Sequence, residues 1–495
     1  MTRALPLVVL LPILTAGCAT GPTSEAPSDP FVGWYANYRT CREEYVAMDA
    51  RVAAAGVADT QYYRVPGYPY MRTDRVLASF AHEVETIDEI GGWVRKMREF
   101  DQEAREFEYR NLGMNTQEAA ESRSRFLNCG RTLAGIELND APQVFAKLQD
   151  TVAPPDIYST AQRAFGFYAF NASAMRSRMD ERRKALEQAY VAPVDQLPAR
   201  APLRLWKVSK VEDLSLVPNV YKGMLPDELG FPGLTDSQWR ALAEYHAPQL
   251  WIESASPEDA PAHPVLTASG PSADPGRHVT HHHITFTRFG GVPLAQINYL
   301  FWFKGASEKA PLDGFIWRVT LDPAAKPLVY ESLHTSGRDH RIYPVQALQR
   351  RTSVDGAAEP VAIAPKLAPE HQATLRISAT THEILRVLGP NELPTDAVGV
   401  AQNYELTRYE DLLALPRPEG GSRSLFGPDG IVPGPHADDP IGGRASGIPE
   451  PGALRALSRL PVVHVGRRHF DEAFLLESVF VPPAPSTAST TRSPG

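Results

Sequence analysis

Proline is the residue that most limits the folds open to this chain. The 495 residues include 45 prolines, which become dense from Pro193 onward. Proline breaks the interior of a helix, because it lacks a backbone N–H and its ring clashes with the preceding turn. Long helices are therefore expected only in the first half of the chain, and strands and loops in the second. At this length we expect two domains.

The first half carries the spacing of amphipathic helices. After a Thr73–Asp74 cap, apolar residues recur every three or four positions as far as Phe107, and Gly91–Gly92 is expected to bend or break this helix. Further helices are predicted over Trp34–Ala55, Gln117–Leu133, Pro142–Gln149 and Asp156–Tyr190. Residues 31–195 are thus predicted to form a helical domain.

The second half changes to the two-residue alternation of β-strands. After a Pro- and Ala-rich linker from Val191 to Leu203, turn signals separate four apolar runs: Ile284–Phe289, Leu294–Phe303, Phe315–Leu321 and Leu328–His334. They predict an antiparallel meander within a β-rich domain over residues 203–481, in which Val398–Asp439 is mostly loop. Residues 482–495 are expected to be a disordered tail. The predicted fold class is α+β, a helical domain followed by a mainly antiparallel β domain with long Pro-rich loops.

The last two of these runs predict one specific contact. The loop between them is short enough to pair Leu321 with Leu328. In that register Arg318 falls opposite Glu331, and a cross-strand ion pair of this kind stabilises the sheet.

The N-terminus has the features of a secretion signal. Arg3 precedes an apolar stretch from Ala4 to Leu14, far shorter than the roughly 20 residues that span a bilayer. We therefore predict that residues 1–17 are a signal peptide that is removed.

The residues around the cleavage point add a lipid anchor. Ala16–Gly17 before Cys18 resembles the bacterial lipobox, in which the cysteine sulfur is acylated and cleavage frees its amine. Ala19 rather than Asp follows the cysteine, which by the sorting rule of such lipoproteins favours the outer membrane, facing the periplasm. Residues 18–30 would be the lipidated cysteine and a flexible tether. The alternative is an ordinary signal peptide followed by an incidental cysteine.

The charge of the chain limits its partners. The formal net charge is −8, and it becomes −9 once Arg3 leaves with the signal peptide. No block of like charge stands out. This distribution argues against binding to nucleic acid or to anionic lipid headgroups.

Two cysteines remain once Cys18 is lipidated. Cys41 and Cys129 both lie in the predicted helical domain. Because the periplasm is oxidising, we expect them to form a disulfide. The alternative is two separate buried thiols.

Histidines are concentrated near one end of the predicted meander. His278, His281, His282 and His283 precede its first strand, and His334 and His340 flank its last. Residues i and i+2 of a strand lie on one side, about 6.5–7 Å apart, so His281 and His283 can reach one metal ion as neutral imidazoles. His334 or His340 would supply a further ligand, and zinc is the ion that this set suits.

Two acidic residues would support such a site. Glu331 or Asp339 would orient a ligand imidazole or act as a general base. Whether His281 and His334 lie at the same end of the sheet depends on a register that the sequence does not fix. The alternative is a polar run at a strand entry and a turn centred on Gly337.

Established catalytic motifs are absent from the sequence. His82–Glu83 and His382–Glu383 each begin a zincin-like motif, but neither is followed by a second histidine one helical turn later. There is no nucleophile elbow, phosphate loop or dinucleotide-binding glycine motif. His464 and His469 flank Arg467–Arg468, which would clamp a carboxylate or phosphate or else form a solvated turn.

Four segments resemble known sequences. They are Pro66–Tyr70, Thr287–Phe303, Asp313–Leu321 and Gly466–Asp471. They resemble blocks in a group of uncharacterised proteobacterial outer-membrane lipoproteins. The resemblance covers both domains in patches and implies the envelope location, but no activity.

Two functions of different classes follow. A non-catalytic binding or scaffold protein, which contacts another envelope protein, is favoured by the missing catalytic motifs. The alternative is a metal-dependent periplasmic hydrolase, favoured by the histidines. A ligand-binding carrier is a third possibility.

Overall fold

The structure is a computed structural model. It describes residues 36–139, 142–197, 201–209, 217–351, 361–367, 372–389, 392, 400–439 and 443–482. The predicted signal peptide, Cys18, the tether and all but the first residue of the predicted tail lie outside the described residues. The α+β fold class is confirmed, since helices precede a large mixed sheet.

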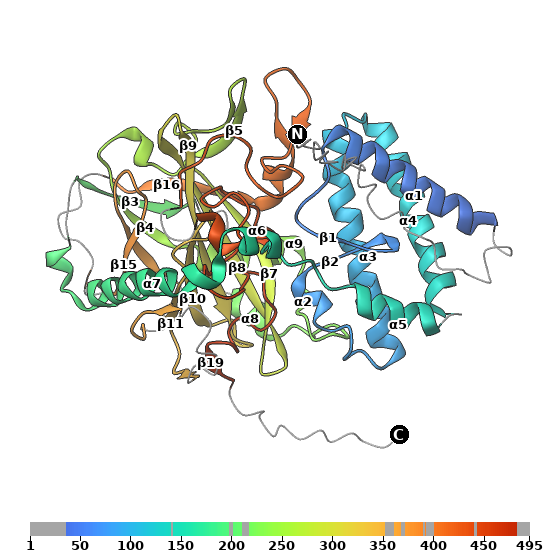
Figure 1. Ribbon diagram of the computed structural model, residues 1–495, viewed down its shortest axis with the longest axis horizontal. Helices are drawn as coiled ribbons and strands as arrows, with labels where there is room; N and C mark the ends of the chain where they lie inside the picture. The colour runs from blue at the N-terminus through green and yellow to red at the C-terminus, as the bar shows by residue number, and fades with distance from the viewer. Residues whose placement is uncertain are drawn as a thin grey trace, which may run out of the picture.

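Five helices and a small hairpin make up one end of the molecule, which we call the helical body (Figure 1). Its elements are α1 (Ala36–Ala55), β1 (Tyr63–Val65), β2 (Tyr68–Thr73), α2 (Arg75–Ala78), α3 (Ile87–Asn111), α4 (Thr116–Asn139) and α5 (Pro142–Thr151). The hairpin contributes Tyr68 and Tyr70 to the apolar core between the helices. The predicted disulfide is confirmed: Cys41 on α1 and Cys129 on α4 are bonded, with their Cα atoms 5.2 Å apart.

The long helix predicted from Asp74 is divided in two. Asp74 does cap a helix, but α2 is only four residues long. A new helix begins after Thr86, because its side chain and that of Glu89 form a reciprocal capping box. Gly91–Gly92 lies within the first turns of α3 and does not break it.

The helix predicted over Asp156–Tyr190 is also divided, into α6 (Thr160–Phe165) and α7 (Tyr168–Val191). The division falls at Gly166, where a Cβ atom would lie 2.7 Å from the Cα of Ala445. Helix α7 contacts β13 of the sheet, and both helices contact the 3₁₀ helix Gly443–Ser446 (Figure 1).

An eleven-stranded sheet forms the rest of the molecule, in the order β13-β11-β10-β9-β8-β7-β16-β3-β4-β14-β15. The strands are β3 (Leu203–Val208), β4 (Gln249–Glu253), β7 (Val279–Phe289), β8 (Val292–Ser307), β9 (Ala310–Leu321), β10 (Pro327–His334), β11 (Arg341–Pro344), β13 (Ala362–Ile363), β14 (Thr374–Ile377), β15 (Ile384–Leu388) and β16 (Gln402–Arg408). The predicted meander is present as β7 to β10. The sheet is mixed, however, because β16 pairs in parallel with both β3 and β7.

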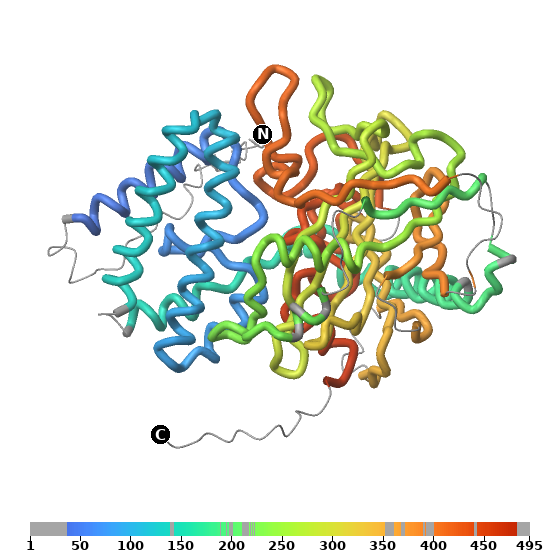
Figure 2. The backbone as a smooth tube through the Cα atoms, turned by 180° about the vertical axis from the view of Figure 1, so that it is seen from behind, coloured from blue at the N-terminus to red at the C-terminus, as the bar shows by residue number. Residues whose placement is uncertain are grey.

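Smaller elements surround the sheet. They are α8 (Val217–Lys222), α9 (Asp236–His246), β5 (His263–Thr267), β6 (Gly270–Asp274), β12 (Gln349–Arg350), β17 (Leu415–Pro416), β18 (Ser422–Arg423), β19 (Phe480–Val481) and the 3₁₀ helices Val194–Gln196, Pro257–Asp259, Tyr409–Ala414, Gly443–Ser446 and Leu457–Arg459. Figure 2 shows the green segment containing α8 and α9 between the helical body and the sheet. No helix in the described ranges combines the length and apolar character needed to cross a bilayer.

The two faces of the sheet differ in chemistry. One face encloses an apolar core to which strands from both ends of the sheet contribute, including Leu250, Tyr299, Trp317, Tyr343 and Leu375. The opposite face carries a row of polar residues from β7 to β10, namely His283, Asn298, Arg318 and Glu331. The predicted ion pair is confirmed, since Arg318 lies opposite Glu331 and the two side chains form a bidentate pair at 2.5 and 2.8 Å. The predicted pairing of Leu321 with Leu328 is wrong, because the register shifts between Pro327 and Val329 and Leu321 pairs with Pro327.

Candidate functional site

The strand register separates the histidines expected to share a metal ion. His281 and His283 lie on β7, whereas His334 ends β10, and β8 and β9 lie between. Three strand spacings place these positions about 14 Å apart. The structure therefore corrects the expectation that His281, His283 and His334 could converge, because β8 and β9 separate β7 from β10.

Each of these imidazoles has its own local environment. Burial lowers the pKa of His281 well below its ordinary value, and neither ring nitrogen has a hydrogen-bond partner. His283 Nδ1 lies 2.7 Å from Glu410 Oε1, and its Nε2 lies 3.0 Å from the amide nitrogen of Gln61. In the interior, His340 Nε2 lies 2.9 Å from Glu331, the partner of Arg318. Within the described ranges, no three His, Cys, Asp or Glu side chains are grouped so that they could hold a metal ion.

A cleft of about 710 Å³ opens between α7 and the carboxyl end of β10; we call it the α7 cleft. Its walls come from α7, the turn between β10 and β11, and the turn between β14 and β15. The charged and imidazole side chains that line it are Arg178, Glu181, Arg182, His334, Arg338, Asp339, Arg341, His382, Glu383 and Asp439. A second cavity of about 210 Å³ shares His334 and Arg338 with it. Two of the predicted site residues, His334 and Asp339, therefore lie in the cleft.

Asp313 holds two imidazoles at the junction of the cleft and the second cavity. His334 Nε2 lies 2.8 Å from one of its oxygens, and His382 Nδ1 lies 2.9 Å from the other. The Nδ1 atom of His334 accepts a hydrogen bond from the backbone N–H of Ser336 at 3.1 Å. In the neutral ring the hydrogen must then be on Nε2, which donates to Asp313. The orientation of His334 is thus fixed from both sides.

These contacts determine the charge of Asp313 and His382. Burial opposes the ionised form of Asp313, yet hydrogen bonds from His334 and His382 hold its pKa well below the ordinary value. Burial also opposes protonation of His382, but the hydrogen bonds and charges of Asp259 and Asp313 raise its pKa. Asp259 is itself held by backbone N–H groups that include that of Thr380, 2.7 Å away, and its pKa is lowered to about 2.

Backbone strain is concentrated around the same cleft. Among the described residues, six that are not glycine have positive φ, and three of them border the α7 cleft or the second cavity. These are Asp339 (φ 60°), Thr380 (φ 67°) and His382 (φ 48°). Such conformations cost of order 1–3 kcal/mol each and cluster at ligand-binding sites.

The arginines of the cleft fall into two groups. Arg182 forms a bidentate pair with Asp339 at 2.5 and 2.7 Å, and Arg341 contacts Glu383 at 2.6 Å. Arg178 and Arg338 have no carboxylate within ion-pair distance in the part of the chain that the structure describes. A guanidinium nitrogen of Arg338 lies 3.2 Å from His334 Nε2. Because that nitrogen carries the hydrogen donated to Asp313, it offers the guanidinium no acceptor.

Sequence reasoning found only part of this cleft. Arg338 stands within the histidine-containing stretch that was singled out, but His382 was considered only as half of a zincin-like motif. Asp313 and His382 are 69 residues apart, and a turn beyond β14 brings them together. Of the other basic candidates, His464 contacts Asp439 of the cleft wall at 2.7 Å, whereas Arg467 and His469 both contact Asp156, outside the cleft.

Comparisons with known proteins give no family: no family model, curated protein or solved structure matches this chain.

Proposed function

We propose that this protein is a lipoprotein of the outer membrane, anchored through Cys18 and facing the periplasm, and that it is a non-catalytic binding protein. The signal-like N-terminus and the disulfide between Cys41 and Cys129 support an oxidising envelope compartment. The resemblance to the group of proteobacterial lipoproteins supports the same location. We propose the α7 cleft as the binding site.

One observation carries the binding proposal. Arg338 lies at the wall of the cleft and has no carboxylate partner among the described residues, although the neighbouring arginines are paired. The N–H of the neighbouring His334 imidazole is already donated to Asp313, so the guanidinium of Arg338 is the group whose donors remain for a ligand. An anionic group in the cleft would accept from this guanidinium, since arginine binds carboxylate and phosphate groups through paired hydrogen bonds.

The dimensions of the cleft fit a small molecule. Its volume of about 710 Å³ lies within the range of ordinary ligand pockets. Most of the residues that line it are charged or polar, and the ligand that we propose carries a carboxylate or a phosphate. The hydrolase alternative gains no support from the geometry, because the histidines on which it depended do not converge.

Ligand-induced stabilisation tests this proposal. Inorganic phosphate, citrate and a hexose phosphate would be titrated into the chain beginning at Ala19, with the melting temperature as the readout. We expect at least one anion to raise it, by about 2.7 kcal/mol of stability at 100 times the dissociation constant. Arg338→Ala should weaken binding about 10- to 100-fold, because a hydrogen bond to a charged group contributes about 1.5–3 kcal/mol.

An exposed arginine of the helical body provides the matched control. Arg123→Ala removes a similar side chain that pairs with Glu106, and it should leave anion binding unchanged. If no anion stabilises the wild-type chain, or if Arg338→Ala responds as the wild type does, the α7 cleft is not an anion site.

A further inference from the structure

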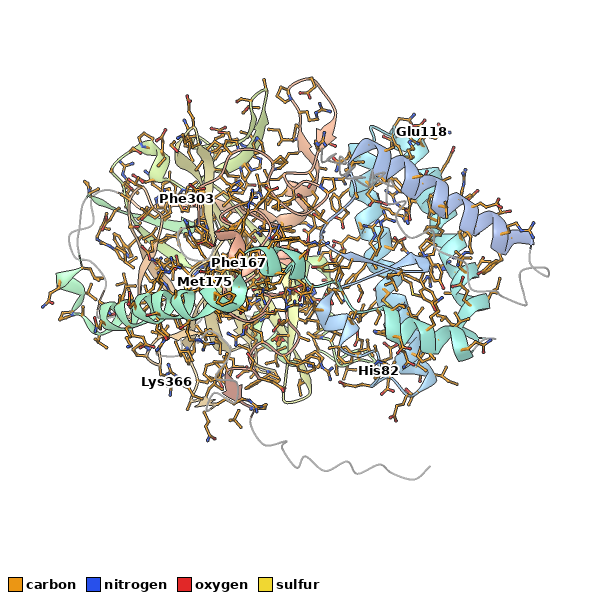
Figure 3. The ribbon with its side chains drawn as sticks, viewed as in Figure 1. His82, Glu118, Phe167, Met175, Phe303 and Lys366 are labelled. Atoms are coloured by element: carbon orange, nitrogen blue, oxygen red, sulfur yellow. A yellow bond between two sulfur atoms is a disulfide. The ribbon has the colours of Figure 1, made fainter. Side chains whose placement is uncertain are left out.

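Three phenylalanines project from the corner between α6 and α7. Phe165, Phe167 and Phe170 are 85, 66 and 83% exposed, and they lie within six residues of one another. Figure 3 shows Phe167 at this corner, in front of the sheet. Large apolar side chains that gather on a surface mark an interaction site more often than single exposed ones do. We call these three residues the phenylalanine corner.

Hydrogen bonds fix the backbone on either side of the phenylalanine corner. Tyr168 accepts a hydrogen bond from the backbone N–H of Gly466, and the Arg163 guanidinium donates to the carbonyl of Ser446 at 2.7 Å. The approach of Gly166 to Ala445 leaves no room for a side chain on the inner side. The aromatic rings are therefore fixed on the outer side of a rigid corner.

The backbone at the centre of the corner is strained. Phe167 has φ 52°, in the left-handed region that bulky side chains rarely adopt. Glycine would fit this position better, and a polar residue would suit its exposure. A strained, exposed phenylalanine is costly for folding alone, which points to a use outside the fold.

The surroundings of the corner carry positive charge. Thr160–Lys184 contains six arginine or lysine residues and two acidic residues, a net charge of +4 within a chain of net charge −8. Arg182 pairs with Asp339, and Arg183 pairs with Asp180 and Glu187, whereas Arg178 and Lys184 have no carboxylate within ion-pair distance among the described residues. The overall charge, which argued against anionic headgroups, thus hides a local basic segment. Aromatic side chains next to basic ones are the composition of surfaces that bind anionic membranes.

We propose that the phenylalanine corner inserts into an anionic phospholipid surface, with the basic residues of α7 lying above the headgroups. Because the three rings are exposed, they can enter a fluid acyl layer without needing a preformed pocket. The proposal goes beyond the binding cleft, and the membrane that it invokes is the one to which the proposed anchor at Cys18 would tether the chain. The 17 residues between Cys18 and Ala36 can extend to about 60 Å, which permits a body held by the anchor to rotate this corner toward the bilayer.

Vesicle sedimentation tests the inference without the lipid anchor. The chain beginning at Ala19 would be mixed with phosphatidylglycerol vesicles and, separately, with phosphatidylcholine vesicles. We expect binding to the anionic vesicles and a loss at 0.5 M salt. Replacing Phe165, Phe167 and Phe170 by serine should lower the partition coefficient at least tenfold.

A matched triple variant controls for the loss of exposed apolar surface. Ile87, Leu225 and Val400 are 89, 85 and 92% exposed and lie in other parts of the chain, so their replacement by serine should leave vesicle binding unchanged. Phe170→Cys, labelled with an environment-sensitive dye, gives a second readout that needs no triple replacement. Its emission should shift to the blue on anionic vesicles.

Several outcomes would overturn the inference. These are no binding by the wild-type chain, equal binding by the phenylalanine triple variant, or no spectral shift from the dye. Self-association of the wild type that the triple variant loses, together with no vesicle binding, would assign the corner to a contact between copies. None of the three phenylalanines lines the α7 cleft, so failure of this inference leaves the anion-binding proposal intact. Anion binding by the phenylalanine triple variant can be measured separately.

Discussion

Buried charge in this protein is arranged mainly as pairs whose partners come from different segments. Arg318 shows the pattern: its guanidinium pairs with Glu331, donates to the carbonyl of Phe470 at 2.7 Å and lies over the ring of that residue. Burial opposes ionisation of Glu331, but the charge of Arg318 lowers its pKa to about 2. Such a pair contributes little net stability, yet removing one partner leaves an uncompensated charge. Arg338, by contrast, has no carboxylate partner among the described residues, and for this reason we propose the α7 cleft as a binding site.

A half-buried acid in the helical body, Glu103, predicts how stability changes with pH. Burial raises the pKa of Glu103 to about 7, although Tyr62 donates a hydrogen bond to it at 3.1 Å. Since the folded pKa exceeds the unfolded value near 4.3, its contribution to stability is present below about pH 4 and is lost as the pH rises through 7. Glu103→Gln should therefore be more stable than the wild type by about 2–3 kcal/mol at pH 8 and unchanged at pH 4.

Urea unfolding at both pH values measures this difference. Glu99→Gln, an exposed acid on the same helix, should change the midpoint equally little at each pH. If the free energies of unfolding of Glu103→Gln and the wild type differ by the same amount at pH 4 and pH 8, the pKa of Glu103 is not raised in the folded protein.

At the level of the elements, a disulfide joins two long helices. Cys41 of α1 and Cys129 of α4 are 88 residues apart in the sequence. Closing a loop of this length stabilises the fold by about 4–5 kcal/mol in the chain-entropy model.

Replacing Cys41 and Cys129 by serine should therefore lower the free energy of unfolding by about 4–5 kcal/mol, measured by urea titration. In the chain beginning at Ala19 these are the only two cysteines, so a thiol assay reports on them alone. The native protein should show no reactive thiol before reduction. Two titratable thiols in unreduced protein would contradict the bond.

Local periodicity decided which elements could be foreseen. Strands β7 to β10 and helices α1, α4 and α5 follow repeats of two or of three to four residues, and each is close to its predicted place. Strand β16, within a stretch expected to be mostly loop, is polar at alternate positions and pairs in parallel with β3 and β7. Its alternation contains only two apolar residues, Tyr404 and Leu406, which is too short to predict a strand, and its partners lie more than 100 residues away. The α7 cleft was partly foreseen through His334 and Asp339, but the contact between Asp313 and His382 depends on the same kind of distant pairing.

At the scale of the whole molecule, the helical body and the sheet share an interface with both apolar and polar contacts. Phe231 lies 5.5 Å from Phe80 of the helical body and 4.8 Å from Phe286 of β7, measured between ring centroids. Beside this cluster, Arg288 of β7 forms a bidentate pair with Glu83. The core of the helical body therefore includes residues that follow α8 or belong to the sheet. An interface built this way couples the folding of the two parts.

Calorimetry tests this coupling. We expect one cooperative unfolding transition for the chain beginning at Ala19, because neither part keeps a complete core without the other. Phe231→Ala should destabilise that single transition by about 3–5 kcal/mol, the usual cost of removing a buried phenylalanine side chain. Phe165→Ala, which removes an 85% exposed ring, should leave the transition unchanged. Two resolved transitions in the wild type, of which Phe231→Ala lowers only one, would show that the helical body and the sheet unfold independently and that the aromatic cluster merely lies between them.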